Sequence, residues 1–74
     1  MIELFGERVL GLLNERGMTQ HELAEAIDVT EVTISRYMTR RREPKATTVM
    51  KIAEFFGVTT DYLLFGKPEP YREE

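Results

Sequence analysis

Residues 19 to 38 constrain the fold of this chain more than any other part of its sequence. Thr19 is a favourable N-cap residue, and Glu22 follows three positions later, which is the spacing of a capping box. Apolar residues then recur at helical spacing, namely Leu23, Ala24 and Ile27. This pattern predicts a helix from Gln20 to about Ile27 with one apolar side.

The next three residues, Asp28, Val29 and Thr30, predict a tight corner followed by a second helix. Aspartate tolerates the left-handed backbone of a sharp corner, and a threonine can cap the helix that follows. In that helix, from Glu31 to about Met38, three apolar residues share the inward side: Ile34, Tyr37 and Met38. The outward side holds Glu31, Val32, Ser35 and Arg36, with Thr33 near the edge. Two helices joined by so short a turn must cross steeply.

Three further helices are expected around this pair. The first covers residues 3 to 16 and ends at Gly17, and its inward residues are Leu4, Phe5, Val9, Leu12 and Leu13. The fourth runs from about residue 46 to 56 and ends at Gly57, with Val49, Ile52, Ala53 and Phe56 buried. After Val58, an expected apolar plug, Thr59 caps a short fifth helix over residues 60 to 65, which ends at Gly66.

No segment shows the strict alternation of polar and apolar residues that is typical of strands. The expected fold class is therefore all-α, a compact bundle of five short helices. Residues 1–66 are expected to form the domain. Residues 67–74 contain two prolines and mostly charged residues, which predicts a flexible tail or the start of a linker.

Charge is distributed unevenly along the chain. The net charge is −3, but residues 36 to 45 contain five basic residues and only one acidic residue, a local balance of +4 that leaves −7 for the remainder. The basic residues are Arg36, Arg40, Arg41, Arg42 and Lys45. A cationic edge on an acidic body favours binding of a polyanion in one orientation. The alternative is a solvated arginine-rich loop without a partner.

Composition excludes several classes of site. The chain has no cysteine and a single histidine, His21, so neither disulfides nor a His- or Cys-rich metal site is expected. His21 is expected to be an exposed helix residue. No apolar run is long enough to span a bilayer, and no signal peptide is visible. We therefore expect a cytoplasmic protein with no membrane segment, no metal and no cofactor.

Taken together, the motifs resemble the phage-repressor/Cro-type (xenobiotic-response-element-like) helix-turn-helix domain, which has the lambda-repressor-like fold. The resemblance covers roughly residues 4 to 66 without gaps. The matching residues are Thr19-Gln20, Glu22-Leu23-Ala24, Val29-Thr30, Ile34-Ser35-Arg36-Tyr37, Arg41-Arg42-Glu43-Pro44, Ile52-Ala53 and Asp61-Tyr62-Leu63-Leu64. The resemblance implies a transcriptional regulator, expected to be a repressor, that reads a palindromic operator in double-stranded DNA as a homodimer.

The resemblance also implies roles for individual residues. Gln20 would contact a phosphate and brace the second helix, and Thr30 would donate to a phosphate. Arg36 would bind guanine, Val32 a thymine methyl, and Glu31 either a cytosine amino group or a neighbouring arginine such as Arg36. The loop residues would contact the DNA backbone. The full expected set is Gln20, Thr30, Glu31, Val32, Thr33, Ser35, Arg36, Arg40, Arg41, Arg42 and Lys45.

The sequence departs from the family pattern in three places. Asp28 and Arg40 stand at corners where the family usually has glycine. Leu13 and Met38 stand where it commonly has an arginine and a glutamate, and because both have become apolar we expect them to pack together. The apolar residues Leu10, Phe55, Leu64 and Phe65 exceed what so small a core needs. Scattered exposed apolar residues are normal, but a cluster of them near the fourth and fifth helices would favour a two-fold interface.

Two other classes of protein fit the sequence less well. An enzyme would need a nucleophile and base or a set of metal ligands; Glu22 and Glu25 resemble a carboxylate pair, but both are expected to be solvated, so no enzyme is predicted. A protein-interaction module remains the alternative, because a helix-turn-helix domain can grip a protein partner, as in antitoxins. The acidic body of the chain and Glu31 keep that alternative open.

Overall fold

The computed structural model describes residues 4–39 and 43–66 of the chain. Within these residues the chain forms α1 (Phe5–Arg16), α2 (Gln20–Ile27), α3 (Glu31–Met38), α4 (Ala46–Phe56) and α5 (Thr60–Phe65). The predicted all-α fold and the order of its helices are confirmed. The predictions for Arg40, Arg41, Arg42 and for residues 67–74 lie outside the described residues.

The starts of three helices follow from their capping threonines. The Thr19 hydroxyl accepts a hydrogen bond from the Glu22 backbone N–H at 3.1 Å, and Glu22 Oε1 accepts from the Thr19 N–H at 2.8 Å, so the predicted capping box is present. The hydroxyls of Thr30 and Thr59 cap α3 and α5 by accepting from the backbone N–H groups of Thr33 and Tyr62. Each cap satisfies a backbone donor that the first turn of a helix leaves unpaired.

The corner between α2 and α3 is as tight as predicted. Asp28 has φ 62°, the left-handed conformation, and among the described residues it is the one non-glycine with positive φ. Its backbone N–H turns back to the end of α2, and the Val29 N–H donates to the Ala24 carbonyl at 3.0 Å. Consequently only three residues separate the end of α2 from the start of α3.

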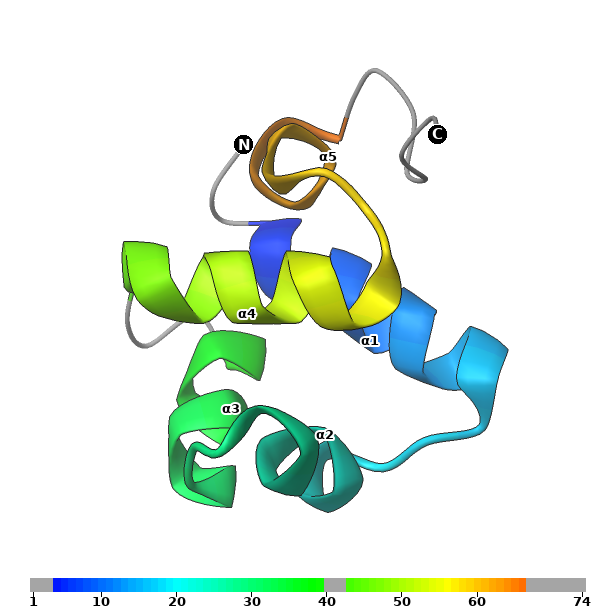
Figure 1. Cartoon of the computed structure of the whole chain (residues 1–74), viewed down its shortest axis with the longest axis vertical. Helices are drawn as coiled ribbons and strands as arrows, with labels where there is room; N and C mark the ends of the chain where they lie inside the picture. The colour runs from blue at the N-terminus through cyan, green and yellow to red at the C-terminus, as the bar shows by residue number, and fades with distance from the viewer. Residues whose placement is uncertain (1–3, 40–42, 67–74) are drawn as a thin grey trace.

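The helices pack around α4, which crosses the middle of the molecule (Figure 1). The α2–α3 pair lies on one side of α4 and α5 lies on the other. Helix α1 contacts both α3 and α5, and α2 contacts both α3 and α4. The α2–α3 pair is therefore fixed to the body by α1 and α4.

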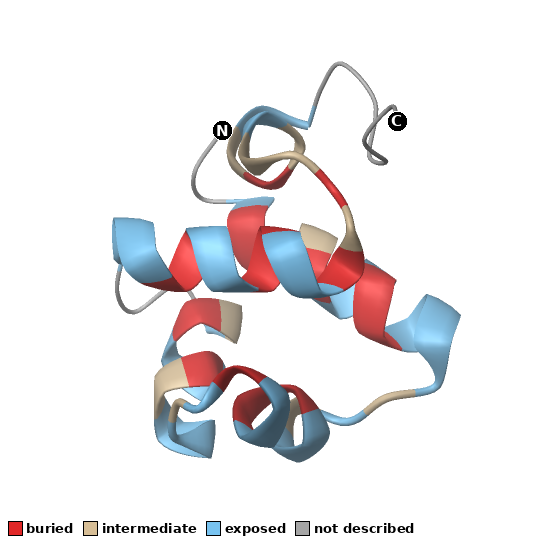
Figure 2. Cartoon of the chain, in the orientation of Figure 1, coloured by how far each residue is buried: buried red, intermediate tan, exposed pale blue. Residues whose placement is uncertain are grey.

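All five helices contribute to one apolar core, and most outward-facing residues are exposed (Figure 2). The predicted core residues are buried, Val58 included, with two exceptions: Met38 is half-buried, and Leu4 is 38% exposed. Leu4 precedes the first regular turn, with ψ 4° at the N-cap position of α1, so the helical phase does not carry it inward. Gly6 and Thr48 are buried although neither was predicted to be.

No helix in the described part of the chain has both the length and the apolar composition needed to cross a membrane.

Candidate nucleic-acid interface

Helix α3 presents one polar side to solvent and buries the other. Ile34 and Tyr37 are 0% and 3% exposed and attach the helix to the core. On the opposite side Val32 is 58% exposed, although a branched apolar side chain is usually buried. The other outward residues, Glu31, Ser35 and Arg36, are exposed as predicted, and Thr33 is half-buried. The predicted reading surface is thus uncovered by the described chain.

The start of α3 is held by two threonine hydroxyls. Thr30 Oγ1 accepts from the Thr33 backbone N–H at 3.1 Å and lies 2.9 Å from Thr33 Oγ1. Either hydroxyl can donate in the second contact. When Thr33 donates, the Thr30 proton is free to point outward, which a contact to a phosphate oxygen requires.

Gln20 is the first residue of α2 and is half-buried, one position after the N-cap residue Thr19. At the start of a helix the backbone N–H groups point outward and favour an anion. The starts of α2 and α3, with Gln20 and Thr30, lie near each other, because His21 in the first turn of α2 contacts Glu31 at the start of α3. Contact of Gln20 with α3 stays a prediction.

The loop after α3 is tied back to that helix by Tyr37. The buried Tyr37 hydroxyl accepts a hydrogen bond from the Lys45 backbone N–H at 3.4 Å, and Lys45 is the N-cap residue of α4. The Lys45 side chain is exposed. This places one cation of the predicted basic edge close to the end of α3; the arginine triplet lies beyond the described residues.

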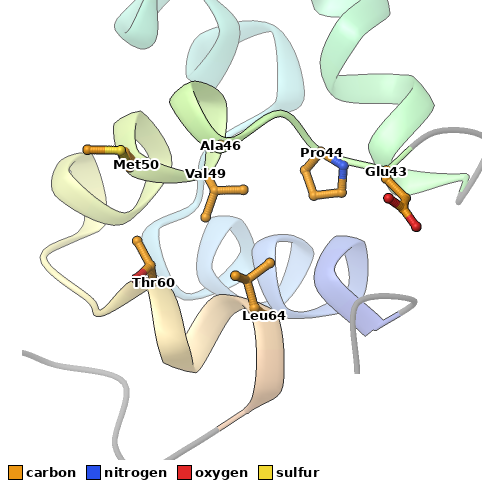
Figure 3. A pocket seen from close by; sticks show the side chains of 7 residues that line it. All are labelled: Glu43, Pro44, Ala46, Val49, Met50, Thr60 and Leu64. Atoms are coloured by element: carbon orange, nitrogen blue, oxygen red, sulfur yellow. The ribbon is translucent and has the colours of Figure 1, made fainter.

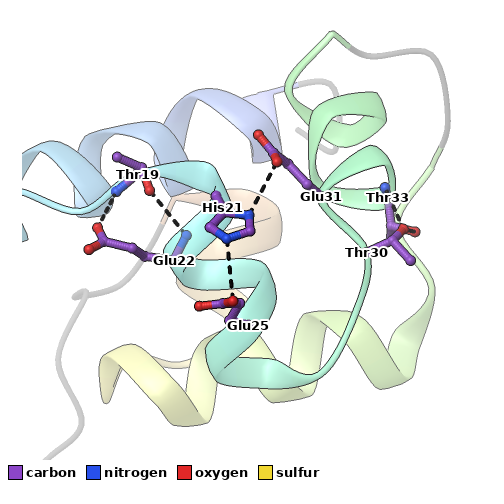
Figure 4. Close-up of polar contacts among 7 residues, drawn as sticks. All are labelled: Thr19, His21, Glu22, Glu25, Thr30, Glu31 and Thr33. Atoms are coloured by element: carbon purple, nitrogen blue, oxygen red, sulfur yellow. Dashed lines mark hydrogen bonds and ion pairs between the residues drawn. The ribbon is translucent and has the colours of Figure 1, made fainter.

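Glu31 contacts a histidine, a partner that the sequence did not reveal. His21 Nδ1 lies 3.3 Å from Glu31 Oε1, while its Nε2 lies 3.3 Å from Glu25 Oε2 (Figure 4). Within the described residues no arginine forms an ion pair with Glu31. The spacing of His21 and Glu25, four residues apart on one helix, could have indicated their contact. The approach of Glu31 depends on the crossing of α2 and α3.

Arg36 lies in the last turn of α3 with its side chain exposed. Within residues 4–39 and 43–66 its guanidinium makes no hydrogen bond or ion pair. It therefore has all its donors available for a ligand, which is the state that bidentate binding of a guanine edge needs.

Leu13 belongs to α1 and Met38 to α3, two helices that are in contact. Leu13 is 1% exposed, and Met38 is half-buried and packs against the core. Because the arginine and the glutamate that the family commonly has at these positions are both replaced by apolar residues, neither position holds a buried charge. Direct contact between the two side chains stays a prediction.

The exposed apolar residues fall into separate regions. A groove of about 330 Å³ runs between α4 and α5, lined by Glu43, Pro44, Ala46, Val49, Met50, Thr60 and Leu64 (Figure 3). Met50 is 61% exposed and had not been predicted as part of an interface. Phe55 instead lines a depression with residues of α2. The predicted apolar cluster of Leu10, Phe55, Leu64 and Phe65 therefore does not line one common groove.

The sequence model of a family described as "Helix-turn-helix" matches residues 12–63. The SPbeta prophage-derived uncharacterized HTH-type transcriptional regulator YonR of Bacillus subtilis (strain 168) is 32% identical over 63 residues, which are 85% of this chain and 58% of that protein. The HTH-type transcriptional regulator ImmR of the same organism is 36% identical over 64 residues, 86% of this chain and 50% of that protein. The cryptic phage CTXphi transcriptional repressor RstR of Vibrio cholerae is 36% identical over 55 residues, 74% of this chain and 50% of that protein.

Among solved structures, the P22 c2 repressor protein in complex with synthetic operator 9T matches with a TM-score of 0.79 and 25% identity, over 85% of this chain and 96% of that one. The predicted fold and family resemblance are thereby confirmed. The relatives are named as regulators of transcription, which agrees with the prediction that the chain is no enzyme. The chain spans about half the length of the curated relatives that it matches.

Proposed function

Because the chain belongs to the helix-turn-helix family, we propose that it binds double-stranded DNA sequence-specifically and regulates transcription as a repressor. The observation that carries the proposal is the exposed side of α3, where no other part of the described chain covers Val32 or Arg36. A helix that is buried on one side and bare on the other can enter the major groove. The match to a repressor crystallised with its operator supports this use of the same fold.

Within this proposal, residues of α3 read bases and their neighbours position the domain. Arg36 binds the guanine edge, Val32 contacts a thymine methyl, and Ser35 hydrogen-bonds a base edge between them. Gln20, Thr30 and Thr33 lie at helix starts suited to phosphate contact. Lys45 and the triplet Arg40, Arg41 and Arg42 contact the DNA backbone.

We further propose that two copies associate through the groove between α4 and α5. Its lining is mostly apolar, and the exposed Met50 at its edge can insert into the groove of a second copy. A two-fold pair of α3 helices would then read two half-sites of a palindrome. Sedimentation of Met50→Glu should show loss of the dimer, while Thr47→Glu, on an exposed position of the same helix outside the groove, should leave it intact.

The experiment that tests DNA binding is selection of sites from random duplexes, followed by gel shifts. Recovery of one palindromic site, bound more weakly by Arg36→Ala than by Lys51→Ala, supports the proposal. Both variants remove one exposed positive charge, but Lys51 lies on α4 in the depression beside Phe55. No enrichment at low salt would instead favour the protein-interaction module on the same scaffold.

A further inference from the structure

His21 joins two carboxylates that belong to different helices. Its two ring nitrogens each lie 3.3 Å from a carboxylate oxygen, of Glu25 on α2 and of Glu31 at the first position of α3 (Figure 4). The three side chains are 57% to 71% exposed, so they form a surface bridge that water can reach. The bridge lies at the N-terminal end of α3, the helix whose exposed side is proposed to read DNA.

The chemistry of the ring decides when both contacts are favourable. A carboxylate can only accept hydrogen bonds, and a neutral imidazole has one N–H donor and one lone pair. With a neutral ring, one of the two contacts sets a lone pair against a carboxylate oxygen. With an imidazolium, both nitrogens donate and the charge of the trio falls from −2 to −1.

The other charged groups near α2 are either engaged elsewhere or lie at the far end of the helix. Glu22, on the same helix, accepts from the Thr19 N–H in the capping box. From α4, Lys51 and Glu54 meet α2 at its opposite end, beside Ala26 and Asp28. Among residues 4–39 and 43–66, Glu25 and Glu31 are therefore the charged groups within ion-pair distance of the ring.

We propose that His21 is a positioning residue that holds the Glu31 carboxylate against α2 when the ring is protonated, and so makes DNA binding pH-dependent. The inference rests on the proposed function. A held and partly neutralised Glu31 repels phosphates less, and it is drawn toward α2 and away from the base that it would otherwise reach. Lowering the pH should therefore raise affinity and reduce discrimination at the base pair that Glu31 reads, which is what Glu31→Gln should do at any pH.

A histidine side chain ordinarily changes charge between about pH 5 and pH 8, and His21 is the single histidine of the chain. The test is the dissociation constant of the full chain for its selected duplex at about pH 5.5 and about pH 8. We expect binding about two- to fivefold tighter per subunit at the lower pH, the range of an exposed ion pair. His21→Gln and Glu31→Gln should lose this difference, whereas Glu25→Gln should keep it because the contact to Glu31 remains.

Equal pH dependence in wild type and His21→Gln would overturn the proposal while leaving DNA binding in place. If no variant and no wild-type chain binds any duplex, the proposed function fails instead. A second measurement needs no DNA: the side-chain carboxyl ¹³C signal of Glu31 should shift with the same midpoint as the His21 ring signals, and this shared step should vanish in His21→Gln. Independent titrations of the two residues would contradict the bridge.

Discussion

Gly6 of α1 lies against the backbone of Tyr37 in α3, so close that a Cβ built on Gly6 would come 2.5 Å from the Tyr37 carbonyl oxygen. The same Cβ would lie 3.0 Å from the Met38 Cα. Because the obstructing atoms belong to the backbone, no side-chain rotation can make room. Gly6 thus sets how closely the end of α3 approaches the body.

Gly6→Ala should therefore destabilise the fold by about 1–3 kcal/mol, the range for overpacking. Gly11→Ala is the matched control, since it lies on the same helix with no atom within 4 Å of the added Cβ. That control should stabilise the chain by up to about 1 kcal/mol through helix propensity. Urea unfolding of both variants measures the difference, and equal stabilities would show that α1 and α3 are less closely packed.

Leu13 and Met38 offer a second test of the same helix contact. Leu13→Arg places an unpaired charge at a position that is 1% exposed, and it should destabilise by about 3 kcal/mol or more. Adding Met38→Glu should recover part of the loss if the two side chains touch, because the pair of charges is then restored. Thermal and urea unfolding of single and double variants give the coupling. A silent Leu13→Arg, or a double variant without recovery, would place the residues apart.

Asp28 occupies a left-handed corner, with φ 62°, where a side chain is tolerated but unfavourable. Asp28→Gly should raise stability by less than about 1 kcal/mol, since the greater freedom of glycine in the unfolded chain offsets part of the gain. Asp28→Ala should lower it by about 1 kcal/mol. The melting temperature should be highest with glycine at position 28, lower with the wild-type aspartate and lowest with alanine. An alanine variant as stable as the wild type would rule out the left-handed conformation at this position.

Arg16 joins the end of α1 to the end of α4. Its Nη2 donates to the Phe56 carbonyl at 2.9 Å, and its guanidinium carbon lies 5.1 Å from the centre of the Phe56 ring. Arg16→Ala removes both contacts and should cost about 1–2 kcal/mol. Arg16→Lys keeps the charge and should lose less, because a cation near the ring and the carbonyl is retained. If both variants unfold like the wild type, the Arg16 contacts contribute nothing measurable to stability.

The sequence predicted those features that depend on neighbouring residues. The capping box at Thr19 and Glu22, and the corner at Asp28, are local, so residue type and spacing were sufficient. Leu4 was misplaced because the periodic pattern was extended past the first regular turn. Gly6 was missed because an apolar stripe says nothing about how closely two backbones approach.

The candidate site was predictable in its outward face but not in its electrostatics. Val32 and Arg36 follow from the phase of one helix, which Ile34 and Tyr37 determine. The His21–Glu31 contact joins two helices, so it depends on a crossing geometry that no local pattern encodes. The groove beside Met50 likewise needs the relative position of α4 and α5.

Salt dependence distinguishes residues that position the domain from those that read bases. If about four phosphates are engaged per subunit, a dimer should show a slope of log affinity against log salt of roughly −7. Lys45→Ala should reduce the magnitude of that slope by about 2 per dimer, one lost phosphate contact in each subunit. Lys51→Ala carries the same charge change on another part of α4 and should leave the slope unchanged. A wild-type slope near zero, or equal slopes for both variants, would mean that Lys45 does not lie against the DNA backbone.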